Sequence, residues 1–167
     1  VALGVVPGSF EADNITLQNG ATLQYSSLGN NNQLTISANR GITLGAGTQT
    51  IERLGQNQIN LNSVISGAGG LYFNALITND SGGTGFANLN AANTFEGDTT
   101  FGWGPVITTG SNQKGWSITL GNKDALQNST VVWENANGYN ENAGRPYKLD
   151  FNAGNGTYTL GGLAGSK

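Results

Sequence analysis

Short triplets of apolar, polar and apolar residues recur along the chain, and they constrain its fold more than any other feature of the sequence. In each triplet the outer residues are aliphatic or aromatic, and the middle residue is usually Thr or Asn. Because side chains alternate between the two faces of a strand, each triplet predicts a short strand with one buried face. The triplets are Ile15-Thr16-Leu17, Leu34-Thr35-Ile36, Ile42-Thr43-Leu44, Ile59-Asn60-Leu61, Ile118-Thr119-Leu120, Leu149-Asp150-Phe151 and Tyr158-Thr159-Leu160.

Glycine and asparagine fill the intervals between the triplets. Of 167 residues, 27 are Gly and 23 are Asn, and both types turn a chain sharply because they tolerate positive φ. Short strands with frequent turns predict an all-β fold in a single domain, residues 1–167. Asn19-Gly20 is the best candidate for a two-residue hairpin turn. Only residues 122–128 are credible as a helix, and that helix would be short.

Repetition favours one all-β architecture over another. The phrase Ile-Thr-Leu occurs three times, and its copies at Ile15 and Ile42 are 27 residues apart. A repeat of roughly 20–50 residues is typical of stacked coils. The repeated phrase, the glycine-rich corners and the scarcity of long apolar runs therefore favour a β-solenoid with a narrow apolar core. An antiparallel β-sandwich stays the alternative, because Asn19-Gly20 could still join hairpins in the first 60 residues.

Several absences remove whole classes of function. The chain has no Cys, Met or His, so it has no disulfide framework, no thiol nucleophile, and neither the usual general base nor the commonest metal ligand. The 7 Lys and Arg are scattered, and the 10 Asp and Glu give a net charge of −3. This balance argues against nucleic acid as a partner. No apolar stretch is long enough to predict insertion into a membrane.

Two pairs of acidic residues, Glu11 with Asp13 and Glu96 with Asp98, are spaced two positions apart. Residues at that spacing share one face of a strand, which is an arrangement that could serve a glycan-cleaving acid pair. Gly97 and the neighbouring threonines indicate that Glu96 and Asp98 lie at a corner, where acidic side chains are ordinarily solvated. We therefore expect no catalytic residues.

The glycine-rich stretches do not indicate a ligand site. Residues 79–85 offer a single carboxylate on a turn, which is too few for a good calcium loop. Residues 67–70 and 82–85 lack the following helix and the Lys of a phosphate-binding loop. We expect no cofactor and no metal.

Four phrases of the chain resemble the autotransporter-associated β-strand repeat, also called the passenger-associated transport repeat. They are VISGAGGL at residues 64–71, LNAANTFEGDTT at 89–100, ITLGNKDAL at 118–126 and LGGLAGS at 160–166. The likeness spans residues 40–166, and ANTFEGDTT is its most specific part. It implies a right-handed parallel β-helix in a secreted or surface-displayed bacterial protein. It also implies no catalytic residues and a structural role, as in stalks, adhesins and export-competent passengers.

Two stretches are longer than this resemblance leads us to expect, at residues 101–115 and 135–148. They predict two long loop insertions that project from the coils and could carry a specific function. Their aromatic residues could form a platform on which sugars stack, or could instead cap a coil or pack at a subunit contact. The candidate glycan-binding residues are Trp103, Trp116, Trp133 and Tyr139.

The two ends of the sequence suggest assembly. Residues 1–6 are apolar and uncharged, and the phrase at residues 160–166 normally leads into another coil, so neither end resembles a cap. Either the chain is a slice of a longer protein, or its ends pair with the next copy and give an open filament. Residues 1–8 would then be an assembly arm that adds to a neighbour. The candidate interface residues are Val1, Leu3, Val5, Val6, Leu160 and Leu163.

The sequence as a whole predicts a non-enzymatic extracellular structural protein, a unit of a bacterial surface filament or adhesin stalk that assembles through open β-edges. We take the start at Val1 as a mature or excised one, from which any export signal has been removed. The expected partner is a second copy of the chain. The alternative is a carbohydrate-binding surface module that uses the loop tryptophans, with a glycan-cleaving enzyme as a more distant third.

Overall fold

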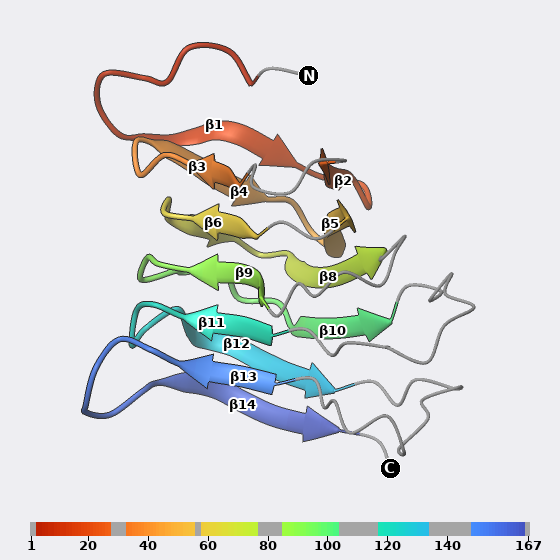
Figure 1. The fold of residues 1–167 in the computed structure, drawn as a ribbon, viewed down its shortest axis with the longest axis vertical. Helices are drawn as coiled ribbons and strands as arrows, with labels where there is room; N and C mark the ends of the chain where they lie inside the picture. Colours follow the sequence, from red (N-terminus) through yellow and green to blue (C-terminus); the bar gives the residue numbers. More distant parts are fainter. Residues whose placement is uncertain are drawn as a thin grey trace.

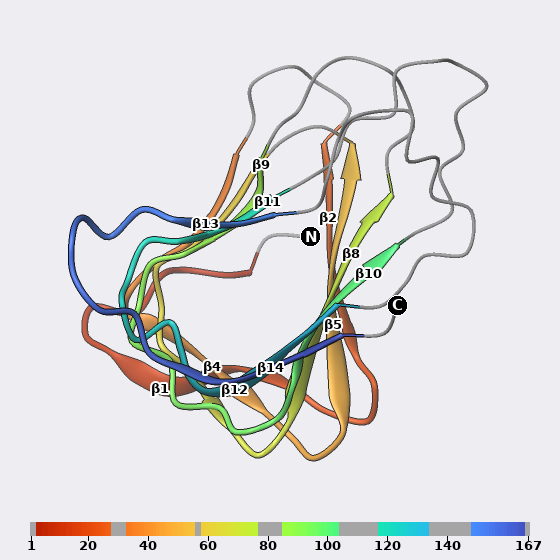
Figure 2. The same ribbon diagram turned by 90° about the horizontal axis from the view of Figure 1, so that it is seen from below.

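The chain winds into a right-handed parallel β-solenoid, which confirms the fold that the sequence favours (Figure 1). The computed structural model describes residues 3–27, 33–55, 58–76, 85–103, 117–133 and 148–165, and every regular element within these ranges is a β-strand. Seen along the axis, the chain passes three walls in turn and then begins the next circuit (Figure 2). A right-handed path is the one that nearly all parallel crossovers take.

Three parallel sheets form these walls. Sheet A contains β1 (Glu11–Leu17), β4 (Arg40–Leu44) and β7 (Ile65–Gly67). Sheet B contains β2 (Thr22–Ser27), β5 (Thr48–Gly55), β8 (Gly70–Leu76), β10 (Thr99–Trp103), β12 (Leu126–Trp133) and β14 (Leu160–Gly165). Sheet C contains β3 (Leu34–Ile36), β6 (Ile59–Leu61), β9 (Gly85–Leu89), β11 (Ser117–Leu120) and β13 (Lys148–Phe151). Every neighbouring pair is parallel, which excludes the antiparallel β-sandwich.

Inward-facing apolar residues stack in columns along the axis. The two columns of sheet C are Leu34, Ile59, Ala87, Ile118, Leu149 and Ile36, Leu61, Leu89, Leu120, Phe151. Six of the seven predicted triplets lie in strands. The exception is Tyr158-Thr159-Leu160, of which only Leu160 belongs to a strand, β14. The strict alternation of the triplets therefore builds a core that continues from one circuit to the next.

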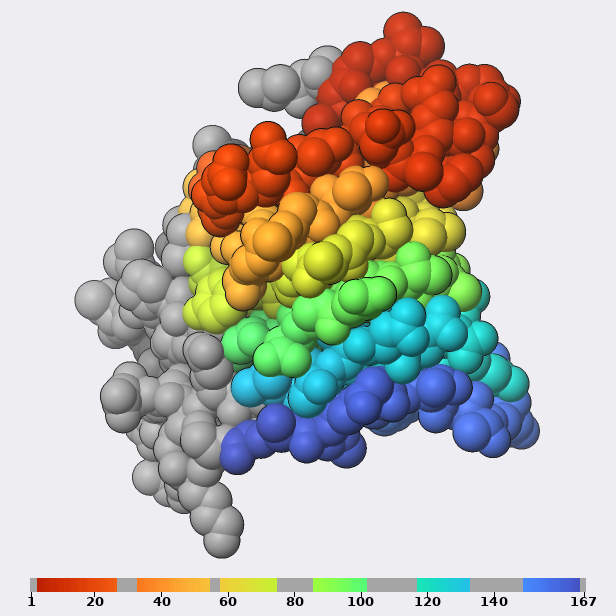
Figure 3. Space-filling model, turned by 180° about the vertical axis from the view of Figure 1, so that it is seen from behind, coloured from red at the N-terminus to blue at the C-terminus, as the bar shows by residue number. Residues whose placement is uncertain are grey.

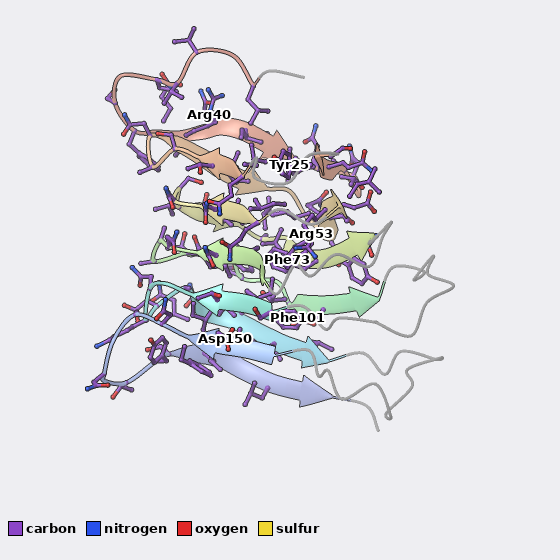
Figure 4. The ribbon with its side chains drawn as sticks, viewed as in Figure 1. Tyr25, Arg40, Arg53, Phe73, Phe101 and Asp150 are labelled. Atoms are coloured by element: carbon purple, nitrogen blue, oxygen red, sulfur yellow. The ribbon has the colours of Figure 1, made fainter. Side chains whose placement is uncertain are left out.

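Aromatic rings and a buried arginine pack together inside the solenoid (Figure 4). The ring centroid of Phe73 lies 5.7 Å from that of Phe86, edge to face, and 6.3 Å from that of Phe101, nearly parallel. The guanidinium carbon of Arg53 lies 5.2 Å from the Phe86 centroid, so the cation rests on a ring face. Burial lowers the pKa of Arg53 to about 10, which leaves the group charged near neutral pH.

Outward-facing amides also pair from one circuit to the next. The Nδ2 of Asn88 donates to Oδ1 of Asn60 at 2.6 Å, and the Nδ2 of Asn90 donates to Oδ1 of Asn62 at 2.7 Å. These side chains satisfy one another along the axis, so they form a structural ladder.

The Asn19-Gly20 turn is present, but the hairpin expected from it is wrong. Both residues have positive φ, 58° and 73°, and the N–H of Ala21 donates to the carbonyl of Gln18 at 3.1 Å. The turn joins β1 of sheet A to β2 of sheet B, and each strand pairs with a strand of the next circuit instead of with the other. The strands pair in this way because β1 and β2 each bury their apolar face beside a parallel neighbour. The turn residues alone do not decide which strands pair.

Glycines recur at the corners because successive circuits touch there. A Cβ on Gly67, which has a φ of 107°, would lie 2.2 Å from the carbonyl oxygen of Leu44. A Cβ on Gly69 would lie 2.0 Å from the carbonyl oxygen of Gly45. No side chain fits between backbones at these distances, so this part of the repeated phrase is restricted to glycine.

The helix expected at residues 122–128 is wrong. The N–H of Asp124 donates to Oδ1 of Asn122 at 2.9 Å, and the N–H of Ala125 donates to the carbonyl of Asn122 at 3.3 Å. The Asn122 side chain thus closes a local turn that competes with a helix. β12 then begins at Leu126, whose side chain is buried in the core.

Asn93, in the most specific phrase of the sequence, ties three circuits together. Its side chain is buried, with Oδ1 accepting from the N–H of Ile65 at 2.9 Å and Nδ2 donating to the carbonyl of Ala125 at 2.9 Å. The following N–H, of Thr94, donates to the carbonyl of Ile65 at 2.8 Å. Among the described strands, sheet A ends at β7. The Asn93 side chain therefore gives the Ile65 N–H of β7 a hydrogen-bond partner that a further strand of sheet A would otherwise provide.

Replacing Asn93 should destabilise the solenoid far more than replacing an amide of the outer ladder. Asn93→Ala leaves a buried N–H and a buried carbonyl without partners, so we expect a loss of about 2–4 kcal/mol in the free energy of unfolding. Asn90→Ala removes an exposed amide pair and should cost about 0.5 kcal/mol or less. Chemical denaturation of both variants measures the difference, and equal losses would contradict the bridging role of Asn93.

Candidate assembly surfaces

The large apolar residues that the structure leaves exposed lie only at the two ends of the solenoid, within the described part of the chain. At the N-terminal end they are Leu3, Val5, Val6 and Phe10, with Val5 the most open at 94% exposed. At the C-terminal end they are Phe151, 52% exposed, and Leu163, 70% exposed. Exposed apolar clusters on a soluble protein commonly mark a contact surface.

The strands at both ends have an open edge. Among the described strands, β1, β2 and β3 each pair only with a strand of the next circuit, and β13 and β14 each pair only with a strand of the circuit before. An open edge presents N–H and carbonyl groups that can accept another strand. The two ends are thus complementary in strand direction, because all the sheets are parallel.

The C-terminal end presents core residues that have no cover. Leu163 continues the inward column of Val131, and Phe151 continues that of Leu120. Val131 and Leu120 are fully buried because a further strand covers them, whereas no described strand covers Leu163 or Phe151. This end therefore has the surface of a core cut across its axis.

The N-terminal end is different, because residues 3–10, here called the N-terminal segment, fold back over the first circuit (Figures 1 and 3). Viewed along the axis, the segment runs across the interior of the solenoid (Figure 2). The backbone of the segment that contains Leu3, Val5 and Val6, the residues expected to reach a neighbouring copy, thus lies over its own chain.

Arg40 fastens the N-terminal segment from inside the solenoid (Figure 4). This buried side chain donates from Nη1 to the carbonyl of Leu3 at 2.6 Å, and from Nη2 to the carbonyls of Gly4 at 3.1 Å and Val5 at 3.0 Å. A fourth hydrogen bond runs from Nη1 to Oδ1 of Asn14 at 2.8 Å. The planar guanidinium is suited to this role because its N–H groups point outward in a fixed fork.

The backbone conformation of the segment directs three of its carbonyls toward Arg40. Gly4 has a φ of 77°, a conformation that glycine adopts without strain, and it lies in the middle of the three carbonyls that Arg40 binds. The Nδ2 of Asn39 adds a hydrogen bond to the carbonyl of Pro7 at 3.0 Å. The segment is held through its backbone, which leaves its valine side chains facing outward.

The sequence identified part of each surface. Leu3, Val5 and Val6 lie at one end, and Leu160 and Leu163 lie at the other, while Val1 lies outside the described residues. The sequence analysis missed Phe10, Phe151 and Arg40. Phe151 was assigned to a strand, but only the topology shows that this strand is the outer one of sheet C. Arg40 stands two positions before the triplet that begins at Ile42, so the alternation of the strand could have marked it as inward-facing.

The side chains of the aromatic residues proposed to bind glycans all lie outside the described residues. Trp103 ends β10 and Trp133 ends β12, and the backbone of Trp133 lies in register with Phe101. The side chains of these two tryptophans, and all of Trp116 and Tyr139, lie outside the described residues, as do most of the two long insertions. The glycan-binding interpretation therefore stays a prediction.

The described residues contain no further chemical centre of the kinds considered from the sequence. Glu96 and Asp98 are exposed at the corner before β10, and Glu11 and Asp13 are exposed on β1. The described part of the chain has no group of three His, Cys, Asp or Glu side chains able to hold a metal. Residues 79–84 of the calcium-loop candidate lie outside it. Among the residues that the structure describes, no helix is long and apolar enough to cross a membrane.

Replacing Arg40 by Lys should loosen the N-terminal segment. A lysine keeps the charge but cannot reach four acceptors with a forked group, so we expect the free energy of unfolding to fall by about 1–3 kcal/mol. Asn39→Ala removes a single bond to the segment and should cost about 1 kcal/mol or less. Chemical denaturation and the NMR order parameters of Val5 and Val6 report both effects. Unchanged order parameters in Arg40→Lys would show that Arg40 does not fasten the segment.

Comparisons with known proteins add no relative to this picture. No family model matches the chain, and neither the curated proteins nor the solved structures gave a match. The likeness to the autotransporter-associated repeat accordingly rests on the four phrases of the sequence.

Proposed function

We propose that this chain is a non-enzymatic structural unit of an extracellular bacterial filament or adhesin stalk, and that it assembles end to end with further copies of itself. One observation carries the proposal: within the described residues, the large exposed apolar side chains lie at the two ends of the solenoid and none lies on its walls. A protein that worked through its walls would be expected to expose such side chains there.

The strand order supports a head-to-tail contact. A second copy placed beyond the C-terminal end would bring β2 beside β14 in sheet B and β3 beside β13 in sheet C. All four strands would keep the direction of their own sheet, so both sheets would continue as parallel sheets. A contact between the two different ends of one molecule does not close on itself and therefore gives an open filament.

The interface residues that we propose are those predicted from the sequence, together with Phe151. On one face they are Leu160, Leu163 and Phe151, and on the other they are the apolar residues of the N-terminal segment, Leu3, Val5 and Val6, with Val1 preceding them. Burial of Leu163 and Phe151 under a further coil would complete the columns that now end with them.

The extracellular bacterial setting is supported by the resemblance to the autotransporter-associated repeat and by a composition rich in Gly and Asn. The non-enzymatic role is supported by the solvated positions of the acidic pairs. The ladder of paired amides on the outer wall serves the solenoid itself, which suits a stalk whose walls need only be stable and soluble.

The test compares two neighbouring positions on β14. Leu163 faces inward and Ala164 faces outward, because Leu163 is in register with buried Val131 and Ala164 with Val132. Sedimentation of the untagged chain should show species that grow with concentration. Leu163→Glu should weaken this association about tenfold or more, because a charge would be buried at the junction. Ala164→Glu adds the same charge on the outer face and should leave the association nearly unchanged.

Two results would overturn the proposal. One is a chain that stays monomeric at every concentration tested. The other is an equal effect of Leu163→Glu and Ala164→Glu, which would mean that the copies meet through a surface other than the cut core at the C-terminal end.

A further inference from the structure

We infer that the N-terminal segment is an autoinhibitory latch: Arg40 holds it over the N-terminal end of the solenoid, and it must be released before a second copy can dock there. This inference deepens the proposed function and rests on it. Arg40 would then control access to the N-terminal end, and the C-terminal end would have no such control.

The first step is that the segment lies over the N-terminal end, where no described strand lies beyond β1. Ile15 and Leu17, on β1, have no strand beyond them in the described structure, yet they are only 9% and 7% exposed. Leu163 and Phe151, on the outermost strands of sheets B and C at the other end, are 70% and 52% exposed. The segment lies across the interior at the N-terminal end (Figure 2), where a further coil would otherwise lie.

The second step is that the segment occupies this space without extending the sheets. No residue from 3 to 10 belongs to a strand, although the segment lies next to β1. Its contacts with the solenoid include the side-chain hydrogen bonds from Arg40 and Asn39. The segment lies over the N-terminal end of the solenoid (Figure 1), in the space that a docking copy would have to enter, so the segment and the docked copy exclude each other.

The third step is that Arg40 is the main attachment of the latch, to which Asn39 adds one hydrogen bond at Pro7. Three carbonyls in a row, those of Leu3, Gly4 and Val5, converge on one buried guanidinium. Charge-assisted hydrogen bonds of this kind are strong, but all of them depend on the backbone conformation of the segment at Gly4. When the segment leaves, Arg40 becomes available to the carbonyls of an arriving copy, and Val5 and Val6 are freed to lie along that copy.

Gly4 allows the latch to be opened without changing the solenoid. Its φ of 77° is strained for any other residue, and a Cβ placed on it meets no atom within 4 Å. Gly4→Val should therefore disturb only the conformation that presents the carbonyls to Arg40. Gly8 provides the matched control, because a Cβ there also meets nothing and no positive φ is required. Gly8→Val adds the same side chain to the same segment.

The experiment measures release and assembly in parallel on the native chain, Gly4→Val, Gly8→Val and Arg40→Lys. Release is read from the NMR order parameters of Val5 and Val6, and assembly from the rate at which light scattering rises. We expect Gly4→Val and Arg40→Lys to lower the order parameters and to speed assembly about tenfold. Gly8→Val should behave as the native chain does.

The outcomes separate the latch from the proposed function. If Gly4→Val frees the segment but assembly is no faster than in the native chain, or is slower, the latch is wrong and end-to-end assembly stands. Slower assembly would specifically show that the docked segment is itself the contact surface. If Gly4→Val frees the segment and neither chain assembles, the proposed function fails, and the latch fails with it.

Discussion

Hydrogen bonding between parallel strands of successive circuits is the interaction on which the whole molecule depends. A parallel coil cannot pair its own strands, because each strand of one circuit belongs to a different sheet, so every circuit finds its backbone partners only above and below. The same stacking buries the apolar columns and aligns the outer amides. It also explains the positions of Gly67 and Gly69, since backbones in contact at the corners leave no room for a side chain.

The ends of such a structure are a physical problem, because among the described residues the outermost circuit on each side has a neighbouring circuit on one side only. The two ends of this chain differ in what lies over the outermost circuit. At the N-terminal end, a segment without regular structure is fixed by Arg40, and Ile15 and Leu17 on the outermost strand are only 9% and 7% exposed. At the C-terminal end, Leu163 and Phe151 are open. The parallel strand order gives the molecule a direction, and directional assembly is the function that we propose for it.

The sequence predicted the walls of the solenoid better than its corners and ends. Triplets such as Ile42-Thr43-Leu44 identified six of the fourteen described strands, four of them in sheet C, because alternation depends only on which face is buried. The hairpin at Asn19-Gly20 and the helix at residues 122–128 were wrong, because local turn chemistry does not say which strand lies alongside. The role of Arg40 depends on residues 35 to 37 positions earlier in the chain, a distance over which periodicity carries no signal. The glycan-binding residues lie in stretches that the described structure does not cover, so their role stays a prediction.

Electron cryomicroscopy of the untagged native chain tests the central claim most directly. The account expects filaments one solenoid wide, in which the strand spacing of about 4.8 Å runs along the filament axis and sheets B and C continue across each junction between copies. Discrete monomers would contradict it, and so would filaments in which copies meet side by side through the walls of the solenoid.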